Sequence, residues 1–249
     1  MFYPAEPATL KRMVAEILAA APAPTSGAKV IIAPHAGYQY SGLTAAHAYR
    51  QFEARRSLIR RVVLLGPAHR VYLKGMALPS VDAFNTPLGD VPIDAEGVRQ
   101  AQEVPCVEVS DEAHAEEHSL EVHLPFLQSV LDNFQLVPIV VGVCTARHVG
   151  AVLDTLWGGD ETAIVVSSDL SHFHTYTEAR EIDANTTARI EARETSLHGE
   201  DACGAYALNG LLLAAKERDL EVRTLDVRNS GDTAGDRFRV VGYGAYALS

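Results

Sequence analysis

Three short apolar runs in this chain each lead into a histidine, and this repeated unit constrains the fold more than any other feature. The first run, residues 30–33, stops at Pro34 and is followed directly by His35. Proline cannot donate to a sheet ladder, so it should end the strand and leave His35 just beyond the strand's carboxyl end. A second run leads to His69 and a third, in variant form, to His172. In open α/β sheets, ligands bind at the edge formed by the carboxyl ends of the strands.

The spacing of the other apolar segments indicates an α/β fold with a mostly parallel sheet. A strand at 30–33, a helix at 43–53 and a strand at 61–65 are typical of a parallel crossover unit. Further strands are predicted at 134–141, 162–167, 221–227 and 238–245, irregular strands within 72–92, and helices at 8–20, 94–102, 119–131, 146–157, 177–193 and 203–217. Since no repeat or domain linker divides the chain, we expect a single domain over residues 1–249.

Composition excludes several classes of partner. The 249 residues are 47% hydrophobic, which is enough for a sizeable core. A formal net charge of −11, without clustered Lys and Arg, argues against direct binding to nucleic acid or to an anionic membrane. Neither an apolar run long enough to span a bilayer nor a signal peptide is evident, so we expect a cytoplasmic protein with reduced cysteines.

The ten histidines favour a metal site. Neutral imidazole is the commonest metal ligand in proteins. A single histidine after a strand is more often a structural hydrogen-bonding residue, but His35, His69 and His172 occupy matching positions. Ligands gathered from several strand ends are also held rigidly enough to fix a coordination geometry.

A second cluster lies between His114 and His123. The segment from His114 to His118 fits the H-x-x-E-H pattern of zinc peptidases, in which two histidines one helical turn apart bind the metal. We expect the helix to begin only near Ser119, which would leave both histidines in a loop. Glu117, His118 and His123 are therefore better interpreted as residues that line a pocket or support the ligands, with a solvated helix start as the alternative.

Three more residues are candidates for the same site. Cys203 lies at the predicted start of an apolar helix, where the pKa of a thiol is lowered and the thiolate becomes a better nucleophile or ligand; it could equally be a small buried side chain. Asp169 could orient His172 as a general acid or base, or cap a helix. Tyr38 could face the same cavity, although ordinary packing explains it as well.

Five motifs in this order resemble the Memo family, including its prokaryotic members named AmmeMemoRadiSam system protein B. They are Ala33-Pro-His-Ala-Gly-Tyr38, Leu65-Gly-Pro-Ala-His69, Glu117-His-Ser-Leu-Glu-Val-His-Leu-Pro-Phe126, Ser167-Ser-Asp-Leu-Ser-His172 and Ser230-Gly-Asp-Thr-Ala-Gly-Asp-Arg237. The resemblance begins at Phe2-Tyr-Pro-Ala5 and runs to the C-terminal strand. That family is similar in fold to the class III extradiol dioxygenases, which implies a three-layer α/β/α domain with a mostly parallel central sheet.

The resemblance also implies roles for individual residues. His35 and His69 match two histidine ligands, Cys203 matches the third ligand of Memo proteins, and His172 is similar to the acid/base histidine of the dioxygenases, with Asp169 beside it. Fe(II) is the metal expected, with copper or zinc as alternatives. The dioxygenases have a carboxylate in place of the cysteine. A thiolate is softer and more easily oxidised, which changes both metal preference and reactivity.

Three hypotheses for function remain at this point. The first is a redox metalloenzyme, dioxygenase-like, acting on a small substrate such as an aromatic compound. The second is a non-catalytic module that binds a peptide or small ligand in the inherited pocket. The third is the zinc peptidase. The family name suggests a pathway link to a radical-SAM protein, and the sequence sets no oligomeric state.

Overall fold

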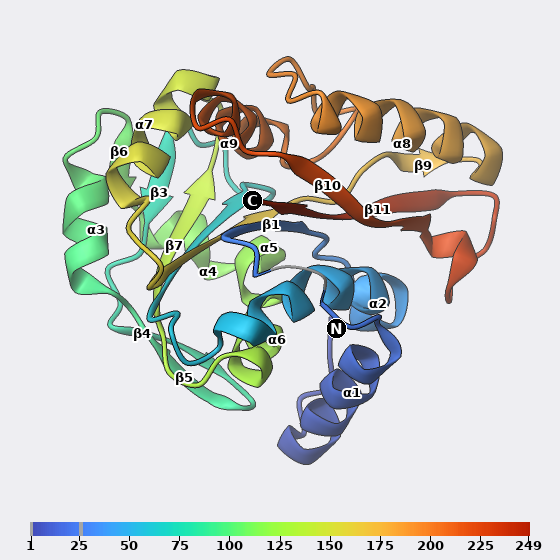
Figure 1. Ribbon diagram of the computed structural model, residues 1–249, viewed down its shortest axis with the longest axis horizontal. Helices are drawn as coiled ribbons and strands as arrows, with labels where there is room; N and C mark the ends of the chain where they lie inside the picture. Colours follow the sequence, from blue (N-terminus) through green and yellow to red (C-terminus); the bar gives the residue numbers. More distant parts are fainter. Residues whose placement is uncertain (1, 25–26) are drawn as a thin grey trace.

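The computed structural model describes residues 2–24 and 27–249, which form a mixed α/β fold around a large sheet (Figure 1). The strands are β1 (Val30–Ala33), β2 (Arg61–Pro67), β3 (Met76–Leu78), β4 (Ala83–Thr86), β5 (Gly89–Pro92), β6 (Val107–Val109), β7 (Gln135–Val141), β8 (Thr162–Ser167), β9 (His172–His174), β10 (Val222–Asn229) and β11 (Val240–Leu248). The helices are α1 (Pro7–Ala20), α2 (Tyr38–Tyr49), α3 (Ala95–Gln102), α4 (Asp111–Ala115), α5 (His118–Glu121), α6 (Leu124–Val130), α7 (Ala146–Leu156), α8 (Tyr176–Glu191) and α9 (Ala205–Glu217), with 3-10 turns η1 (Arg50–Arg55) and η2 (Ser230–Asp232).

The main sheet has the strand order β10-β11-β1-β8-β2-β7-β3-β6. Its four central strands, β1, β8, β2 and β7, are parallel to their neighbours in this group. Strand β11 joins β1 and β10 in antiparallel register, and β9 pairs with the start of β11. The prediction of a mostly parallel α/β sheet is therefore confirmed.

Helices cover both faces of the sheet because the central strands bury side chains on both sides. In β1, Ile31 and Ala33 face the core beneath α1, α2 and α6, whereas Val30 and Ile32 face the core beneath α7 and α9. The sequences of such strands are continuous apolar runs, without alternation of apolar and polar residues. Figure 1 shows the three layers, with α1, α2 and α6 on one side of the sheet and α7 and α9 on the other.

Some predicted elements differ from the observed ones near the site. The single helix expected at 119–131 is divided into α5 and α6, because Pro125 lacks an amide hydrogen and its ring clashes with the preceding turn of a continuous helix. Helix α2 begins at Tyr38, earlier than predicted, where the Tyr38 amide donates to the carbonyl of Phe2. Of the irregular strands, β3 joins the main sheet, whereas β4 and β5 form a separate hairpin.

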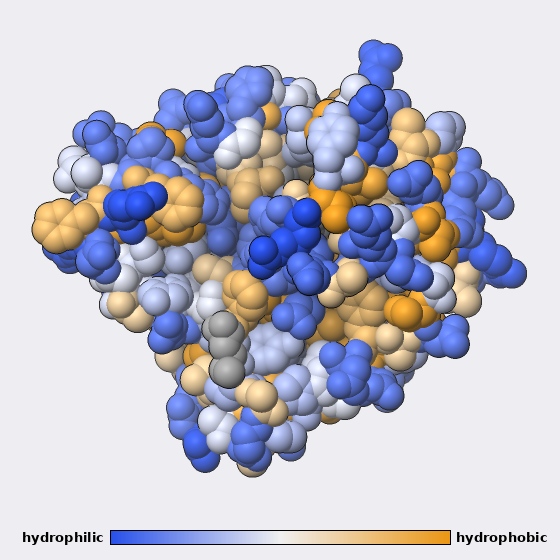
Figure 2. All heavy atoms as spheres, turned by 180° about the vertical axis from the view of Figure 1, so that it is seen from behind, coloured by the Kyte–Doolittle hydropathy of each residue, from blue (hydrophilic) through white to orange (hydrophobic). Residues whose placement is uncertain are grey.

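The outer surface fits the composition. The face in Figure 2 is covered mainly by hydrophilic residues, with apolar residues exposed among them. Within the described residues, no helix combines the length and the apolar character needed to cross a bilayer.

Candidate metal centre

Three neighbouring parallel strands bring polar side chains to one edge of the sheet. His35 follows β1, His69 follows β2, and Asp169 follows β8, which lies between them. The proline stops act as the sequence suggests, since His35 comes directly after Pro34 and the last residue of β2 is Pro67. The carboxyl ends of these strands therefore converge on a single region.

A histidine from a fourth segment completes a group that could hold a metal ion. One ring nitrogen from each of His35, His69 and His118 lies within 4.8 Å of those of the other two. His118 is the first residue of α5, and its ring is stacked on that of His69 with 5.0 Å between centroids. The rings of His35 and His69 meet edge to face at 5.2 Å. The group places His118 beside the two histidines that follow strands.

His35 is held as a buried, neutral imidazole whose two ring nitrogens have different surroundings. Its Nδ1 lies 2.6 Å from the hydroxyl of Ser167, which leaves Nε2 facing the site. Its backbone amide donates to Asp169 Oδ1 at 2.9 Å. Burial, helped by the neighbouring His69 and His118, holds the pKa of His35 well below its usual range. A neutral ring is the form that binds metals.

Glu117 organises the second and third histidines. Its carboxylate accepts hydrogen bonds from the amide of His69 at 2.6 Å, from His69 Nδ1 at 2.9 Å and from the amide of Ser119 at 2.9 Å. Burial acts to raise the pKa of Glu117, but these hydrogen bonds overcome it and lower the pKa to about 2. A carboxylate bound to the second nitrogen of a histidine is the usual support for a metal ligand.

Cys203 lies against the histidine group, but its thiol is not activated as expected. Its Sγ is 3.6 Å from His35 Nε2 and accepts a hydrogen bond from the amide of Asp169 at 3.2 Å. Helix α9 begins only at Ala205, and Cys203 is partly buried near the carboxyl group of Asp169. Burial, followed by the charge of Asp169, raises the pKa of Cys203 to about 12. The prediction of a lowered thiol pKa is wrong, because desolvation and the charge of Asp169 outweigh the hydrogen bonds to the sulfur.

Asp169 and His172 flank the group. Asp169 Oδ2 lies 3.9 Å from His35 Nε2, and burial raises the pKa of Asp169 against the opposing hydrogen bond from the His35 amide. His172 does not stand directly at a strand end. It begins β9, which is paired with β11, and its charge acts on both His35 and Asp169.

The zinc-peptidase arrangement does not form. His114 lies in α4 and His118 in α5, so the expected loop is instead two short helices capped by Ser110 and Glu117. His114 Nε2 bonds the carbonyl of Ala77 at 3.0 Å, and His114 is outside the metal-binding group. The two histidines therefore do not share a helical face, which that hypothesis requires.

The remaining predicted residues lie behind the site. Tyr38 is buried, donates to the carbonyl of Val122 at 2.7 Å and packs against Phe126. His123 is also buried, and its Nδ1 lies 2.6 Å from the hydroxyl of Tyr49. Its ring centroid is 6.4 Å from that of His35.

Sequence reasoning missed two residues that contact the histidines. Ser167 orients His35, as described above. Phe2 stacks on the outer face of His118, with 4.4 Å between centroids and 10° between ring planes. Both lie in stretches that carry the family resemblance, Ser167 in the Ser-Ser-Asp motif and Phe2 at the N-terminal end of the similarity. Their place in these stretches is the sequence feature that could have identified them as site residues.

A cavity of about 590 Å³ borders the centre on the side of His118. Its walls include Phe2, Glu117 and His118, and Phe84 of the β4–β5 hairpin together with Arg70. Its volume is in the range of small-molecule sites. The β4–β5 hairpin, within the region 72–92 for which the sequence predicts irregular strands, therefore borders this cavity.

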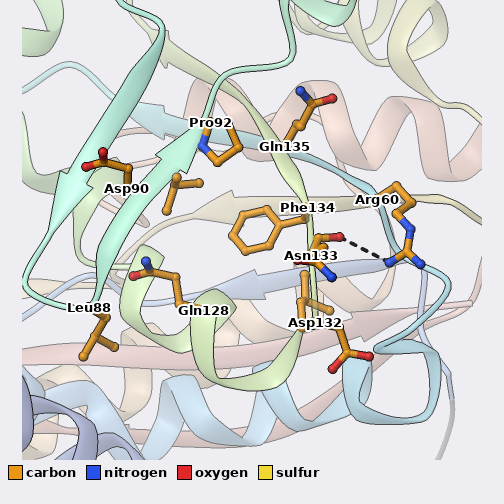
Figure 3. A pocket seen from close by; sticks show the side chains of 11 residues that line it. Arg60, Leu88, Asp90, Pro92, Gln128, Asp132, Asn133, Phe134 and Gln135 are labelled. Atoms are coloured by element: carbon orange, nitrogen blue, oxygen red, sulfur yellow. Dashed lines mark hydrogen bonds between the residues drawn. The ribbon is translucent and has the colours of Figure 1, made fainter.

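Another cavity, of about 480 Å³, lies at the opposite edge of the sheet, where β2 and β7 begin. Figure 3 shows Phe134 and Gln128 lining it, with Arg60 bonded to the carbonyl of Asn133. It contains none of the predicted site residues.

Comparison with known proteins gives consistent matches. The family model described as Memo-like protein matches residues 1–247. A MEMO1 family protein from Methanothermobacter thermautotrophicus is 35% identical over 97% of the chain and 95% of its own length. Another, from Aquifex aeolicus, is 35% identical over 97% of the chain and 94% of its own length. One from Methanopyrus kandleri is 34% identical over 98% of the chain and 94% of its own length. The crystal structure of an uncharacterised protein from Escherichia coli K12 has a TM-score of 0.54 at 11% identity, covering 86% of this chain and 98% of that one, and supports the fold alone.

Proposed function

The chain belongs to the Memo-like protein family, and we propose that it is a metal-dependent redox enzyme that acts on a small substrate such as an aromatic compound. The observation that carries this proposal is the convergence of ring nitrogens from His35, His69 and His118 within 4.8 Å at the ligand-binding edge of an α/β sheet.

The donor set fits a transition metal. His35 and His118 have pKa values lowered by burial, which favours neutral, metal-binding rings. In the part of the chain that the structure describes, the buried Nδ1 of His118 makes no hydrogen bond, and Glu117 Oε1 lies 3.5 Å from it. We propose His35, His69 and His118 as nitrogen ligands and Cys203 as a sulfur ligand, whose thiol loses its proton on coordination. Imidazole with thiolate suits Fe(II), with copper or zinc as alternatives.

A bound iron ion would supply one-electron redox chemistry to a substrate in the adjoining cavity. The chain's own residues would handle protons. Asp169, with its raised pKa, can hold a proton at its carboxyl group close to His35. His172 is the proposed general acid and base, because an imidazole exchanges protons near neutral pH. Phe2 and Phe84 supply apolar walls that exclude water from one side.

The test is metal analysis of protein purified without oxygen. We expect about one Fe(II) ion per chain, and loss of binding in the His35→Ala and His69→Ala variants. His198→Ala, on an exposed loop, is the matched control and should bind as the wild type. A metal-free protein, or binding unchanged in the double variant of His35 and His69, would overturn the proposal. Metal binding without turnover in a broad oxidase and dioxygenase screen would favour the non-catalytic binding module instead.

A further inference from the structure

The segment that carries Asp169 and His172 is anchored to β11. The amide of Leu170 donates to the carbonyl of Gly242 at 2.8 Å, and the amide of Gly242 donates to the carbonyl of Ser171 at 2.8 Å. The segment therefore exchanges two backbone hydrogen bonds with one residue of the sheet.

A carboxylate from helix α8 holds the same segment. Asp183 is 2% exposed, and its Oδ1 accepts a hydrogen bond from the amide of Ser171 at 3.0 Å. Its other oxygen, Oδ2, occupies the space that a side chain at position 242 would need, so Gly242 permits this close approach. Over residues 2–24 and 27–249, no salt bridge involves Asp183.

A buried carboxylate that forms no salt bridge is costly, although His174 lies near enough to act on Asp183, and stability alone is a poor reason for it. Burial raises the pKa of Asp183, against the hydrogen bonding from Ser171. An apolar side chain of similar size would fill the space without this cost. What it could not do is accept the amide hydrogen of Ser171, one residue before His172.

The backbone beyond Ser171 is also strained. Phe173 has φ of 63°, in the left-handed region that bulky residues rarely adopt. Its side chain is 62% exposed, with the ring of His172 edge to face at 5.7 Å between centroids and Arg239 over its ring at 4.9 Å. Figure 2 shows apolar and hydrophilic residues side by side at its left edge, where the region of β9 and the start of β11 projects. Such strain persists only where the surrounding structure fixes the backbone.

We propose that Asp183 is a positioning residue, which acts through Ser171 and together with Gly242 to fix Asp169 and His172 beside the histidine group. It does not touch the centre itself. The inference rests on the proposed function for the role of His172, but the geometry it predicts is measurable in the metal-free protein.

The test compares Asp183→Ala with Asp183→Asn by nuclear magnetic resonance of protein labelled with 15N at histidine. The signal of His172 is identified by its absence in His172→Gln. We expect Asp183→Ala to shift this signal. Asp183→Asn keeps an oxygen that can accept from the Ser171 amide, so the His172 signal of this variant should lie at its wild-type position. Thr186→Val, at a buried position one turn along the same helix, is the control and should leave the signal in place.

Two further measurements separate the possible failures. If Asp183→Ala does not fold, Asp183→Ser takes its place, because its hydroxyl is too short to reach the Ser171 amide and the same shift is expected. A thermal unfolding temperature that falls while the His172 signal stays at its wild-type position would overturn the proposal, since it indicates a purely structural role. Absence of Co²⁺ binding by the wild type would overturn the proposed function instead, and leaves the His172 comparison intact.

Discussion

Glu117 fixes both the backbone and the ring of His69, accepting from the amide at 2.6 Å and from Nδ1 at 2.9 Å. The two bonds go to different oxygens of one carboxylate, so the ring cannot rotate without breaking one of them. Because Nδ1 is the donor, the proton of the neutral ring is on that nitrogen and Nε2 is left as the metal-binding atom. The carboxylate thus selects the tautomer that a metal site needs.

Replacing Glu117 by Gln should damage both stability and metal binding. An amide NH₂ would face a donor, either the His69 amide or Nδ1, and leave buried polar groups unsatisfied. We expect a loss of about 1–3 kcal/mol in the free energy of unfolding and Co²⁺ binding weaker by about 10–100-fold. Urea unfolding and cobalt titration measure these effects. Glu116→Gln, at the exposed neighbouring position, should change neither quantity appreciably.

The same carboxylate predicts a dependence of stability on pH. Its pKa is lowered from 4.5 in the unfolded chain to about 2 in the folded protein, so folding favours the ionised form. Its contribution to stability is complete above about pH 4.5 and is lost as the pH falls towards 2. The difference in unfolding free energy between the wild type and Glu117→Gln should therefore shrink between pH 6 and pH 3. A constant difference over that interval would contradict this assignment.

Part of the centre could be predicted from the sequence because strand ends are local features. The proline stops and apolar runs of β1 and β2 place His35 and His69 without knowledge of the rest of the fold. The sequence predicts His118 as a pocket residue and not as a ligand. Its position depends on how α5 packs against the sheet, and hydrophobic periodicity does not reveal the short helices α4 and α5.

The pKa of Cys203 illustrates a different limit. Position at a helix start predicts a lowered pKa, but the fold buries the thiol beside Asp169, more than thirty residues away in sequence. Burial is a sum over distant contacts, and no local pattern reports it.

The raised pKa of Cys203 gives a prediction for thiol chemistry. In metal-free protein at pH 8, a thiol with a pKa of about 12 has very little thiolate, so iodoacetamide should not modify Cys203. Cys144, whose pKa burial raises to about 11, should also resist, whereas the exposed Cys106 should react. Mass spectrometry of peptides after timed labelling measures the order. Cys203 reacting as fast as Cys106 would mean that its thiol is not protonated and buried as described.

Bound cobalt should report directly on Cys203. If Cys203 is a ligand, the Co²⁺ protein has a sulfur-to-metal charge-transfer band in the near ultraviolet, and Cys203→Ser abolishes it while the three histidines still retain the metal. Cys144→Ser is the matched control, since Cys144 packs against the apolar core beneath α7 and α9, whereas Cys203 Sγ lies 3.6 Å from His35 Nε2. A band that survives in Cys203→Ser would assign the sulfur contact to another residue.

The contact between Gly66 and α5 links the sheet to the third histidine. A Cβ at Gly66 would lie 2.7 Å from Ser119 Oγ and 2.8 Å from Leu120 Cδ2, closer than packed atoms tolerate. The new Cβ would also lie 3.0 Å from the Ser119 carbonyl oxygen, so Gly66→Ala should displace the backbone of α5, and His118 with it. We expect a loss of about 1–3 kcal/mol in unfolding free energy, together with weaker Co²⁺ binding. Gly199→Ala is the control, because a Cβ there meets no atom within 4 Å. If Gly66→Ala loses stability but binds cobalt as tightly as the wild type, His118 does not need its position on α5 to hold the metal.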